Sequence, residues 1–159
     1  MPVTNLRSKW LNGHLSFKQV GSTGGRHIVE TGSYHYQGSF TTAQANTGAT
    51  ILPALPGFKY RMQDMALIAV GGAAATATSV DIEGTQATSV VKLMDGRVAG
   101  LTENTLLRAG TATNGLILAA GASFAACDAN TAITLGVTTD NLATATAIIV
   151  LLTYTIEEA

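Results

Sequence analysis

Charged residues are scarce in this chain of 159 residues. Lys, Arg, Asp and Glu together make up 12% of the sequence, about half of their usual share in a soluble domain. Apolar residues make up 47%, which is enough to build the core of a single domain. A free monomer with so little surface charge would tend to associate, so we expect partners to cover part of its surface.

Cysteines and long apolar runs are also nearly absent. Cys127 is the only cysteine, which excludes an internal disulfide bond and a cysteine-ligated zinc site. We expect it to be a small buried apolar residue rather than a nucleophile. No run approaches the roughly 18 to 20 apolar residues of a membrane helix, and the first residues lack the apolar centre of a signal peptide. The sequence therefore predicts a soluble protein, made in the cytoplasm, without a membrane partner.

Basic clusters of the kind that bind nucleic acid are missing. Residues 1–75 contain six basic and two acidic residues, a net charge of +4, whereas residues 76–159 contain three basic and eight acidic residues, a net charge of −5. The N-terminal part could settle on an acidic surface. Its Lys and Arg residues do not gather along a groove with interleaved aromatic residues, so we expect no nucleic acid partner.

Recurrent catalytic and ligand-binding motifs are absent as well. The Gly-rich loop at 21–25 lacks the Gly-Lys-Ser/Thr ending of a phosphate-binding loop, and His27 and His35 do not have a recurrent metal-ligand spacing. Asp81 and Glu83 are two positions apart, so an extended strand would place both carboxylates on one face, which we interpret as a solvated face. No Gly-x-Ser-x-Gly nucleophile motif occurs. We therefore expect no enzyme activity, no metal and no cofactor.

Short strands separated by turns account for most of what the sequence does contain. Asp95-Gly96 is the kind of dipeptide that forms a two-residue hairpin turn, and Thr102–Ala109 is the best candidate for a helix. The clearer predicted strands are Thr47–Leu52, Tyr60–Val70, Thr76–Glu83, Thr88–Met94, Gly115–Ala120, Ala132–Val137 and Thr144–Ile156. Strands in this number and with this spacing predict an all-β fold, an antiparallel β-sandwich of jelly-roll type.

The last predicted strand is the most informative segment of the chain. Its even-numbered residues from 148 to 156 are all aliphatic or aromatic, and Ile149 and Leu151 make the opposite face apolar too. One apolar face is enough to pack on a core. We therefore expect Ile149 and Leu151 to contact a second layer or another subunit.

The first 45 residues differ in composition from the rest. They contain the single tryptophan, all three histidines, the Gly-rich loop and an alternating segment, YHYQGSF, at 34–40. We interpret residues 1–45 as an extended arm or hairpin, which would gain its stability from the surface it lies on, and residues 46–159 as the sandwich domain. In that domain, Ala73–Ala77 and Ala143–Ala147 indicate either close contact between sheets or subunits or simply a thin core.

Five segments resemble the small capsid decoration, or cement, proteins of tailed bacteriophages. They are ILPALPG at 51–57, YRMQDMALIAVGG at 60–72, ATATSVDIEG at 75–84, AGASFAACDANTAITL at 120–135 and ATAIIVLLTYTIEE at 145–158. The resemblance implies a jelly-roll protein that sits on the outer surface of a virion as a homotrimer and binds the major capsid protein. Ile149 and Leu151 would then pack against neighbouring copies around a threefold axis. The residues of the arm that would bind at junctions between capsid subunits are Arg7, Lys9, Trp10 and Arg26.

Two other functions are open at this point. The chain could be a phage tail or fibre module that binds carbohydrate or another receptor, for which Tyr34, Tyr36 and Phe40 would form an exposed aromatic cluster. The same spacing equally suits one buried strand face. A small β-fold enzyme that uses the histidines and carboxylates named above is the third possibility.

Overall fold

A computed structural model of the chain describes residues 6–11, 14–19, 32–110, 114–116 and 119–159. The chain divides into two compact units, Met1–Gly32 and Ser33–Ala159. In the first unit, β1 (Leu6–Leu11) and β2 (His14–Gln19) form an antiparallel hairpin. The second unit contains two antiparallel sheets that pack as a sandwich.

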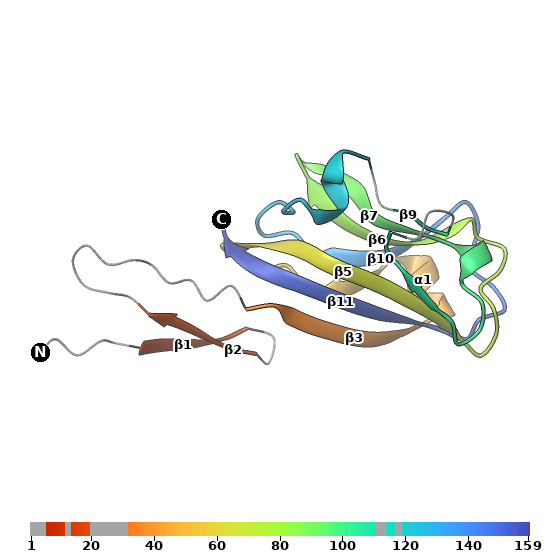
Figure 1. Ribbon diagram of the computed structural model, residues 1–159, viewed down its shortest axis with the longest axis horizontal. Coiled ribbons are helices and arrows are strands. Elements are labelled where there is room, and N and C mark those ends of the chain that lie inside the picture. The colour runs from red at the N-terminus through yellow and green to blue at the C-terminus, as the bar shows by residue number, and fades with distance from the viewer. Residues whose placement is uncertain (1–5, 12–13, 20–31, 111–113, 117–118) are drawn as a thin grey trace, which may run out of the picture. The chain divides into compact units, whose positions relative to one another are not determined.

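The sandwich consists of a four-stranded sheet, in the order β3-β11-β5-β8, and a five-stranded sheet, in the order β4-β10-β6-β7-β9 (Figure 1). The first sheet contains β3 (Tyr34–Thr41), β5 (Phe58–Val70), β8 (Leu106–Arg108) and β11 (Ala147–Glu158). The second contains β4 (Ala49–Leu52), β6 (Ser79–Gln86), β7 (Ser89–Arg97), β9 (Gly115–Leu116) and β10 (Ile133–Thr138). The connections include a short helix, α1 (Thr42–Thr47), and two 3₁₀ helices, η1 (Val98–Gly100) and η2 (Ala119–Phe124).

The strands pair like one long hairpin that has been wound around the core. β3 pairs with β11, β4 with β10, β5 with β8 and β6 with β7, so each pair is enclosed in the sequence by the pair before it. This nesting is the connectivity of a jelly roll. The predicted all-β antiparallel sandwich is therefore confirmed, and β9 adds a short edge beside β7.

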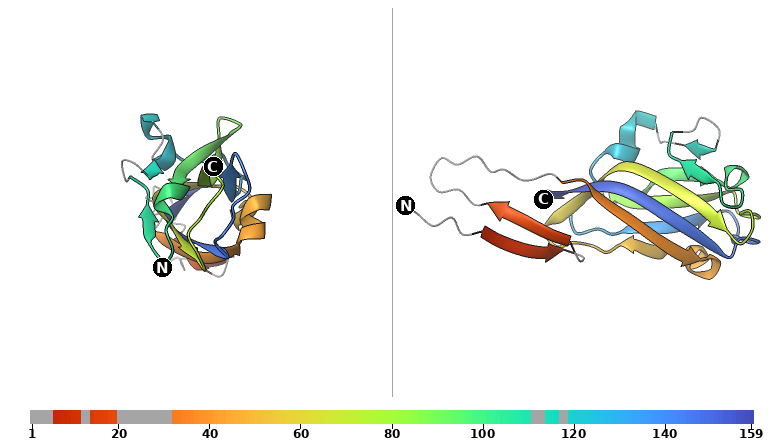
Figure 2. Two further views of the ribbon diagram at one scale, coloured as in Figure 1. Left: turned by 90° about the vertical axis from the view of Figure 1, so that its right-hand side faces the viewer. Right: turned by 60° about the horizontal axis from the view of Figure 1, so that its bottom comes forward.

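The core lies between the sheets and is built from alternate residues of their central strands. Fully buried side chains come from both layers: Met65, Leu67, Ile148 and Val150 from the four-stranded sheet, and Val80, Ile82, Met94 and Leu135 from the five-stranded sheet. Seen end-on, the strands of the two sheets surround this core (Figure 2). Burying each such side chain stabilises the fold by roughly 1.5 to 3 kcal/mol.

A bulge in β5 changes which of its residues face the core. The pairing of β5 with β11 slips by one place at Gln63. On one side of the slip Tyr60 and Met62 are buried, and on the other side Met65 and Leu67 are buried. The bulge therefore lets a strand of 13 residues contribute to the core along its whole length, although its alternation changes from even to odd positions.

The border between arm and sandwich lies earlier than the predicted one at residues 45 and 46. β3 pairs with β11 along its whole length, from Tyr34 opposite Tyr154 to Thr41 opposite Ala147, and the sandwich unit begins at Ser33. The alternation in YHYQGSF explains this difference, because it places every second side chain of β3 on the side of the sheet that faces the core. The segment read as the end of an arm is an edge strand.

The helix predicted over Thr102–Ala109 is wrong. β8 occupies part of that segment, and a helix forms instead at α1. A capping box begins α1: the Gln44 N–H donates to Thr41 Oγ1 at 3.3 Å, and the Thr41 N–H donates to Gln44 Oε1 at 2.9 Å. Gly48, with φ of 82°, ends it. So short a helix has too few turns to show an apolar periodicity. Of the strand predicted over Gly115–Ala120, β9 covers Gly115–Leu116, and Ala119 and Ala120 lie in η2.

The turn predicted at Asp95-Gly96 is also wrong, because both residues lie within β7. The β6–β7 hairpin turns instead at Ala87 and Thr88, whose φ values are 49° and 65°. The Asp128 carboxylate accepts both of their N–H groups, at 3.1 and 2.7 Å, and so stabilises this turn. Gly96 serves packing, since a Cβ there would come within 2.6 Å of Leu67 Cδ1 in the facing sheet.

The two alanine-rich segments lie beside each other at the ends of strands. Ala75 and Ala143 form an isolated antiparallel bridge, in which each N–H donates to the other residue's carbonyl, at 3.2 and 3.0 Å. The close contact expected of small residues thus occurs within the sandwich, between these two segments.

Candidate interaction surface

The outer side of the four-stranded sheet carries an apolar patch over its central strands. Opposite residues of antiparallel strands share a face, and Ile149 lies opposite Ile68, while Leu151 lies opposite Ala66. The alternate residues of β11, such as Ile148 and Val150, face the core. The patch is called here the apolar face and consists of the partly or fully exposed residues Ile68, Val70, Leu106, Ala147, Ile149 and Leu151. Both residues predicted for a subunit contact therefore lie on it.

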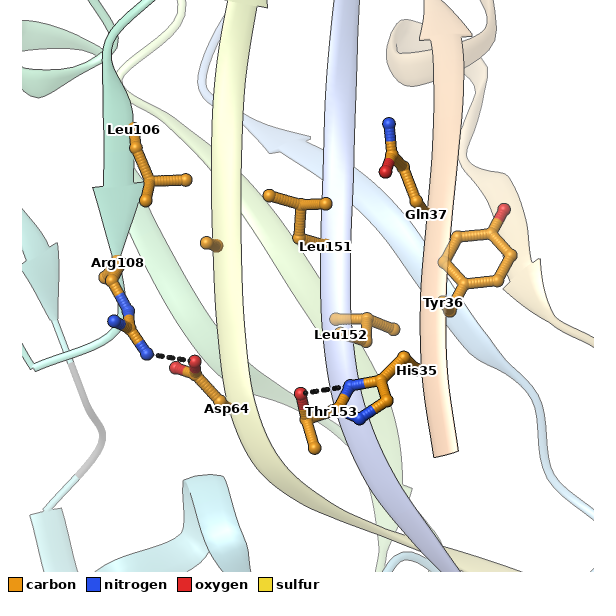
Figure 3. Close-up of a pocket in the computed structure, with 10 residues that line it drawn as sticks. His35, Tyr36, Gln37, Asp64, Leu106, Arg108, Leu151, Leu152 and Thr153 are labelled. Atoms are coloured by element: carbon orange, nitrogen blue, oxygen red, sulfur yellow. Dashed lines mark hydrogen bonds and ion pairs between the residues drawn. The ribbon is translucent and has the colours of Figure 1, made fainter. Parts of the chain in front are cut away.

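An open groove with a volume of about 300 Å³ crosses this side of the sheet (Figure 3). Its floor is aliphatic and includes Ala66, Leu106 and Leu151. Polar side chains from all four strands form its rim, namely His35, Gln37, Asp64, Arg108 and Thr153. An aliphatic centre within a polar rim is the usual composition of a protein–protein interface.

Four of the five polar side chains at the rim of the groove have partners within the chain. Asp64 of β5 and Arg108 of β8 form an ion pair, and His35 Nδ1 lies 3.1 Å from Thr153 Oγ1. A second molecule could therefore cover this side of the sheet without leaving Asp64 or Arg108 as an uncompensated charge. The groove favours a largely apolar contact rather than recognition of a charged ligand.

The outer side of the five-stranded sheet is polar and is closed by its own residues. The Asp81 carboxylate is fully buried, and its Oδ2 atom lies 2.9 Å from Lys92 Nζ and accepts the Thr138 hydroxyl at 2.5 Å. Lys92 Nζ also lies 3.8 Å from Asp95 Oδ2, and Arg97 Nε lies 3.2 Å from Asp95 Oδ1. These five residues are called here the ion network. Among the described residues, Val90, at the turn end of β7, is the one large apolar side chain that is exposed on this side.

The expectation that Asp81 and Glu83 lie on a solvated face is wrong for Asp81. The pairing of β6 with β7 slips between Ile82 and Glu83, and the Lys92 side chain reaches across β6 to Thr138, so that it covers the Asp81 carboxylate. Glu83 is half-buried. Burial raises the pKa of Glu83, and the negative charge of Asp81 raises it further, while Lys92 acts in the opposite direction.

Three of the four arm residues predicted to bind a capsid lie in β1, which contains Arg7, Lys9 and Trp10. In the hairpin register Arg7 is opposite Lys18, and Trp10 is opposite Leu15. The fourth residue, Arg26, lies outside the described residues. Their role in capsid binding stays a prediction.

The aromatic residues considered for receptor binding lie on the core side of β3. Tyr34, Tyr36 and Phe40 are opposite Tyr154, Leu152 and Ile148 of β11, all of which are buried. The Tyr34 ring stacks on Tyr154 with a centroid distance of 5.7 Å, and Phe40 is itself buried. The spacing of these aromatics therefore reflects one inner strand face rather than an exposed platform.

Among the remaining candidates for chemistry, the structure describes the surroundings of the Cys127 thiol. Cys127 is buried, and burial is the main cause that raises the pKa of its thiol to about 11, so a thiolate is disfavoured there. His27 and the Gly-rich loop lie outside the described residues. Where the structure is described, it contains no group of His, Cys, Asp and Glu residues suited to a metal ion, nor a helix long and apolar enough to cross a membrane.

The sequence interpretation missed half of the apolar face. Ile68 and Val70 belong to the run Met65–Val70, in which six consecutive residues are apolar, and this is the same signal that identified Ile149 and Leu151. Leu106 was missed because its segment was predicted to be helical. Both central strands of this sheet, β5 and β11, are thus apolar at even-numbered and at odd-numbered positions.

No protein-family model matches the sequence, and comparisons with curated proteins and with solved structures found no match. The function of the chain is therefore inferred from its own surfaces, and above all from the contrast between the apolar face and the polar side of the other sheet.

Proposed function

We propose that the chain is a non-enzymatic structural protein of a bacteriophage virion, which binds the outer surface of the capsid as a homotrimer and stabilises the shell. The observation that carries this proposal is the apolar face. It lies on the outside of a folded sandwich whose sequence has only 12% charged residues. An exposed apolar patch with a polar rim is typical of a surface that is covered in the working assembly. Jelly-roll connectivity and the resemblance of residues 46–159 to capsid decoration proteins support the same function.

In the proposed trimer, neighbouring copies cover each other's apolar face around a threefold axis. Ile149 and Leu151 lie at the centre of this contact, and Leu106, which is 49% exposed, lies beside them. Because these side chains are already partly covered by their own sheet, burying each of them contributes about 1 kcal/mol. The ion pair between Asp64 and Arg108 would lie at the border, where it can stay hydrated.

The proposed action on the shell is mechanical. The arm would bind at junctions between capsid subunits through Arg7, Lys9, Trp10 and Arg26. A protein that binds the assembled shell but not its separated subunits stabilises assembly by mass action. Three arms on one trimer bind with an increased effective concentration, so that weak single contacts become a firm attachment.

The alternative, a tail or fibre module that binds carbohydrate, receives less support. It would need an exposed aromatic platform, whereas Tyr34 and Phe40 lie on the core side of β3. Binding of the purified protein to a glycan array would favour this alternative over the proposed function.

The proposed function can be tested with empty shells assembled from the major capsid protein of the same virion. The full chain should sediment alone as trimers or as assemblies of trimers, co-sediment with the shells and raise the temperature at which they dissociate. A variant that lacks residues 2–30 should remain a folded trimer, because the sandwich unit begins at Ser33, but should stay in the supernatant. A full chain that is monomeric and does not bind these shells would contradict the proposal.

A further inference from the structure

Strand β3 forms the longest free sheet edge of the sandwich unit. The two sheets end at β3, β8, β4 and β9. β8, β4 and β9 have three, four and two residues, whereas β3 has eight and pairs with β11 without a register shift. In Figure 1 and in the right-hand view of Figure 2, β3 runs along the margin of the four-stranded sheet. A long regular edge strand is a template for pairing with another strand.

The hydrogen bonds at the end of β3 determine which backbone groups face this edge. The Thr42 N–H donates to the carbonyl of Thr146, at 3.1 Å, and so points towards β11. The preceding Thr41 N–H points the other way, because it donates to the Gln44 side chain at 2.9 Å. In an antiparallel ladder this direction alternates from residue to residue. The even-numbered residues of β3 therefore bond to β11, and the odd-numbered residues face outward.

Three residues consequently present unpaired backbone groups at this edge. They are His35, Gln37 and Ser39, whose backbone N–H and C=O groups are called here the free edge. No other described segment pairs with them. Thr41 does not belong to the free edge, because the cap of α1 uses its N–H. The free edge is thus a defined set of donors and acceptors.

The usual protections against strand pairing are missing from β3. Its sequence, YHYQGSFT, contains no Lys, Arg, Asp or Glu and no proline. Its pairing contains no bulge that would twist the edge away. Natural proteins normally use one of these devices on an edge that must stay single. Their absence indicates that the edge is occupied when the protein acts.

We propose that the free edge pairs with the free edge of a second copy of the chain, antiparallel about a twofold axis centred on Gln37. In this register Gln37 lies opposite its counterpart, and His35 lies opposite Ser39. Every residue of the free edge therefore meets another residue of the free edge, and each N–H finds a C=O. The edge is complementary to itself, and its lack of charge means that two copies do not repel each other.

The neighbouring residues fit the same register. Tyr36 would lie opposite Gly38 of the second copy, which has no side chain of its own. Within one copy Gly38 is already covered by the Tyr36 side chain, and a Cβ at this position would collide with the ring. A charged partner strand would gain nothing from an uncharged edge, so a second copy is the occupant that the sequence of β3 favours.

This pairing deepens the proposed function, on which its biological role rests. The threefold contact would use the side chains of the apolar face, and the twofold contact would use the outward backbone groups of β3, so that one copy can make both. His35 and Gln37, whose side chains lie at the rim of the groove, would border both contacts. Closed shells contain threefold and twofold axes together. Trimers joined at their edges would form a continuous net over a shell, whereas trimers alone would bind as separate units.

The first test is a disulfide trap at the centre of the proposed twofold axis. Residues opposite each other in a hydrogen-bonded antiparallel pair have Cα atoms about 5.5 Å apart, within the range that a disulfide bond spans. Gln37→Cys should therefore form a covalent dimer under mild oxidation, whereas Ala43→Cys, on the exposed side of α1, should not. Cys127 is buried and does not compete. If Gln37→Cys forms no more dimer than Ala43→Cys, the pairing is overturned.

A second test separates the edge contact from the trimer contact. Gln37→Pro removes one outward N–H, and proline is tolerated at a sheet edge, while Gln37→Ala keeps the N–H. In a Leu151→Asp background, which should lack the trimer, Gln37→Ala should still form dimers in sedimentation equilibrium, and Gln37→Pro should weaken them at least tenfold. Equal dimerisation of the two folded variants would overturn the pairing. If the proposed trimer contact is wrong, the Leu151→Asp variant alone will have the same mass in solution as the unsubstituted protein.

Discussion

The outer faces of the two sheets meet their surroundings in opposite ways. On the five-stranded sheet, the ion network pairs each of its carboxylates with a cation of the same chain, and the Lys92 side chain covers the buried Asp81 carboxylate, whose Oδ1 atom has no hydrogen-bond partner among the described residues. On the four-stranded sheet, the apolar face has no such cover among the described residues, and Leu106 is 49% exposed. The charges of one face are paired within a single copy, whereas the apolar side chains at the centre of the other face stay partly exposed. The difference identifies which side of the sandwich is built for a partner.

The largest effect is expected from placing a charge on each face in turn. Leu151→Asp would bury a carboxylate in the proposed subunit contact, and should weaken trimer formation by roughly 4 kcal/mol, a factor of about a thousand. It should leave species no larger than the edge-paired dimer. Val90→Asp is the matched control, because Val90 is 70% exposed and lies opposite Thr85 on the outer side of β6 and β7.

Sedimentation equilibrium of the two variants measures this difference. Val90→Asp should keep the mass of the unsubstituted protein, and both variants should unfold with a free energy within about 1 kcal/mol of it. An intact trimer of Leu151→Asp would show that the apolar face is not the subunit contact. Loss of the trimer in both variants would remove the distinction between the two faces.

The next largest effect is expected from removing a cation from the ion network. Lys92→Met leaves the fully buried Asp81 carboxylate with the Thr138 hydroxyl but without a cation, and should lower the free energy of unfolding by about 3 kcal/mol. Arg97→Met should cost less, about 1 kcal/mol, because the Arg97 side chain is 39% exposed and the buried Asp95 keeps Lys92 nearby.

Urea unfolding at neutral pH measures both values. Adding Asp81→Asn to Lys92→Met should recover part of the loss, because an amide does not need a counter-charge. A Lys92→Met variant as stable as the unsubstituted protein would mean that water reaches Asp81 and that the polar face is not closed.

Much of the fold could be predicted from alternation and turn residues, and the errors have physical causes. The C-terminal strand was correct because Ile148, Val150 and Leu152 keep one parity through the core. The Asp95-Gly96 turn failed because local turn preference competes with packing, and Gly96 is needed where Leu67 of the facing sheet comes close. Such a close approach is a tertiary property that no local pattern contains.

The candidate surface could be predicted only where a strand is apolar at both even-numbered and odd-numbered positions. Ile149 and Leu151 met this condition and were found. Asp81 was assigned to solvent because alternation gives the face of a residue but not what covers it. Its burial depends on the Lys92 side chain, which reaches across β6. The free edge of β3 also escaped notice, since sheet order is set by pairings between residues far apart in the sequence.

The smallest effect on the free energy of unfolding is expected from neutralising two carboxylates, one beside the ion network and one on the four-stranded sheet. Burial and the Asp81 charge raise the pKa of Glu83. A raised folded-state pKa means that the stability contributed by the protonated form is lost as the pH rises through that pKa. At neutral pH the ionised Glu83 is therefore unfavourable. Glu83→Gln should raise the free energy of unfolding at pH 7 by up to about 1 kcal/mol.

Glu157→Gln is the matched control and should have the opposite sign. The hydrogen bond from Arg61, 2.5 Å long, lowers the pKa of Glu157, so its contribution is present above the ordinary glutamate pKa and is lost as the pH falls through the lowered value. Because both side chains are partly exposed, removing this pair should cost only a few tenths of a kcal/mol at pH 7. Unfolding free energies measured from pH 7 down to pH 3 should converge with those of the unsubstituted protein for both variants. A Glu83→Gln variant that is less stable at pH 7 would mean that the Glu83 charge supports the ion network, and the closed polar face would then depend on three carboxylates rather than two.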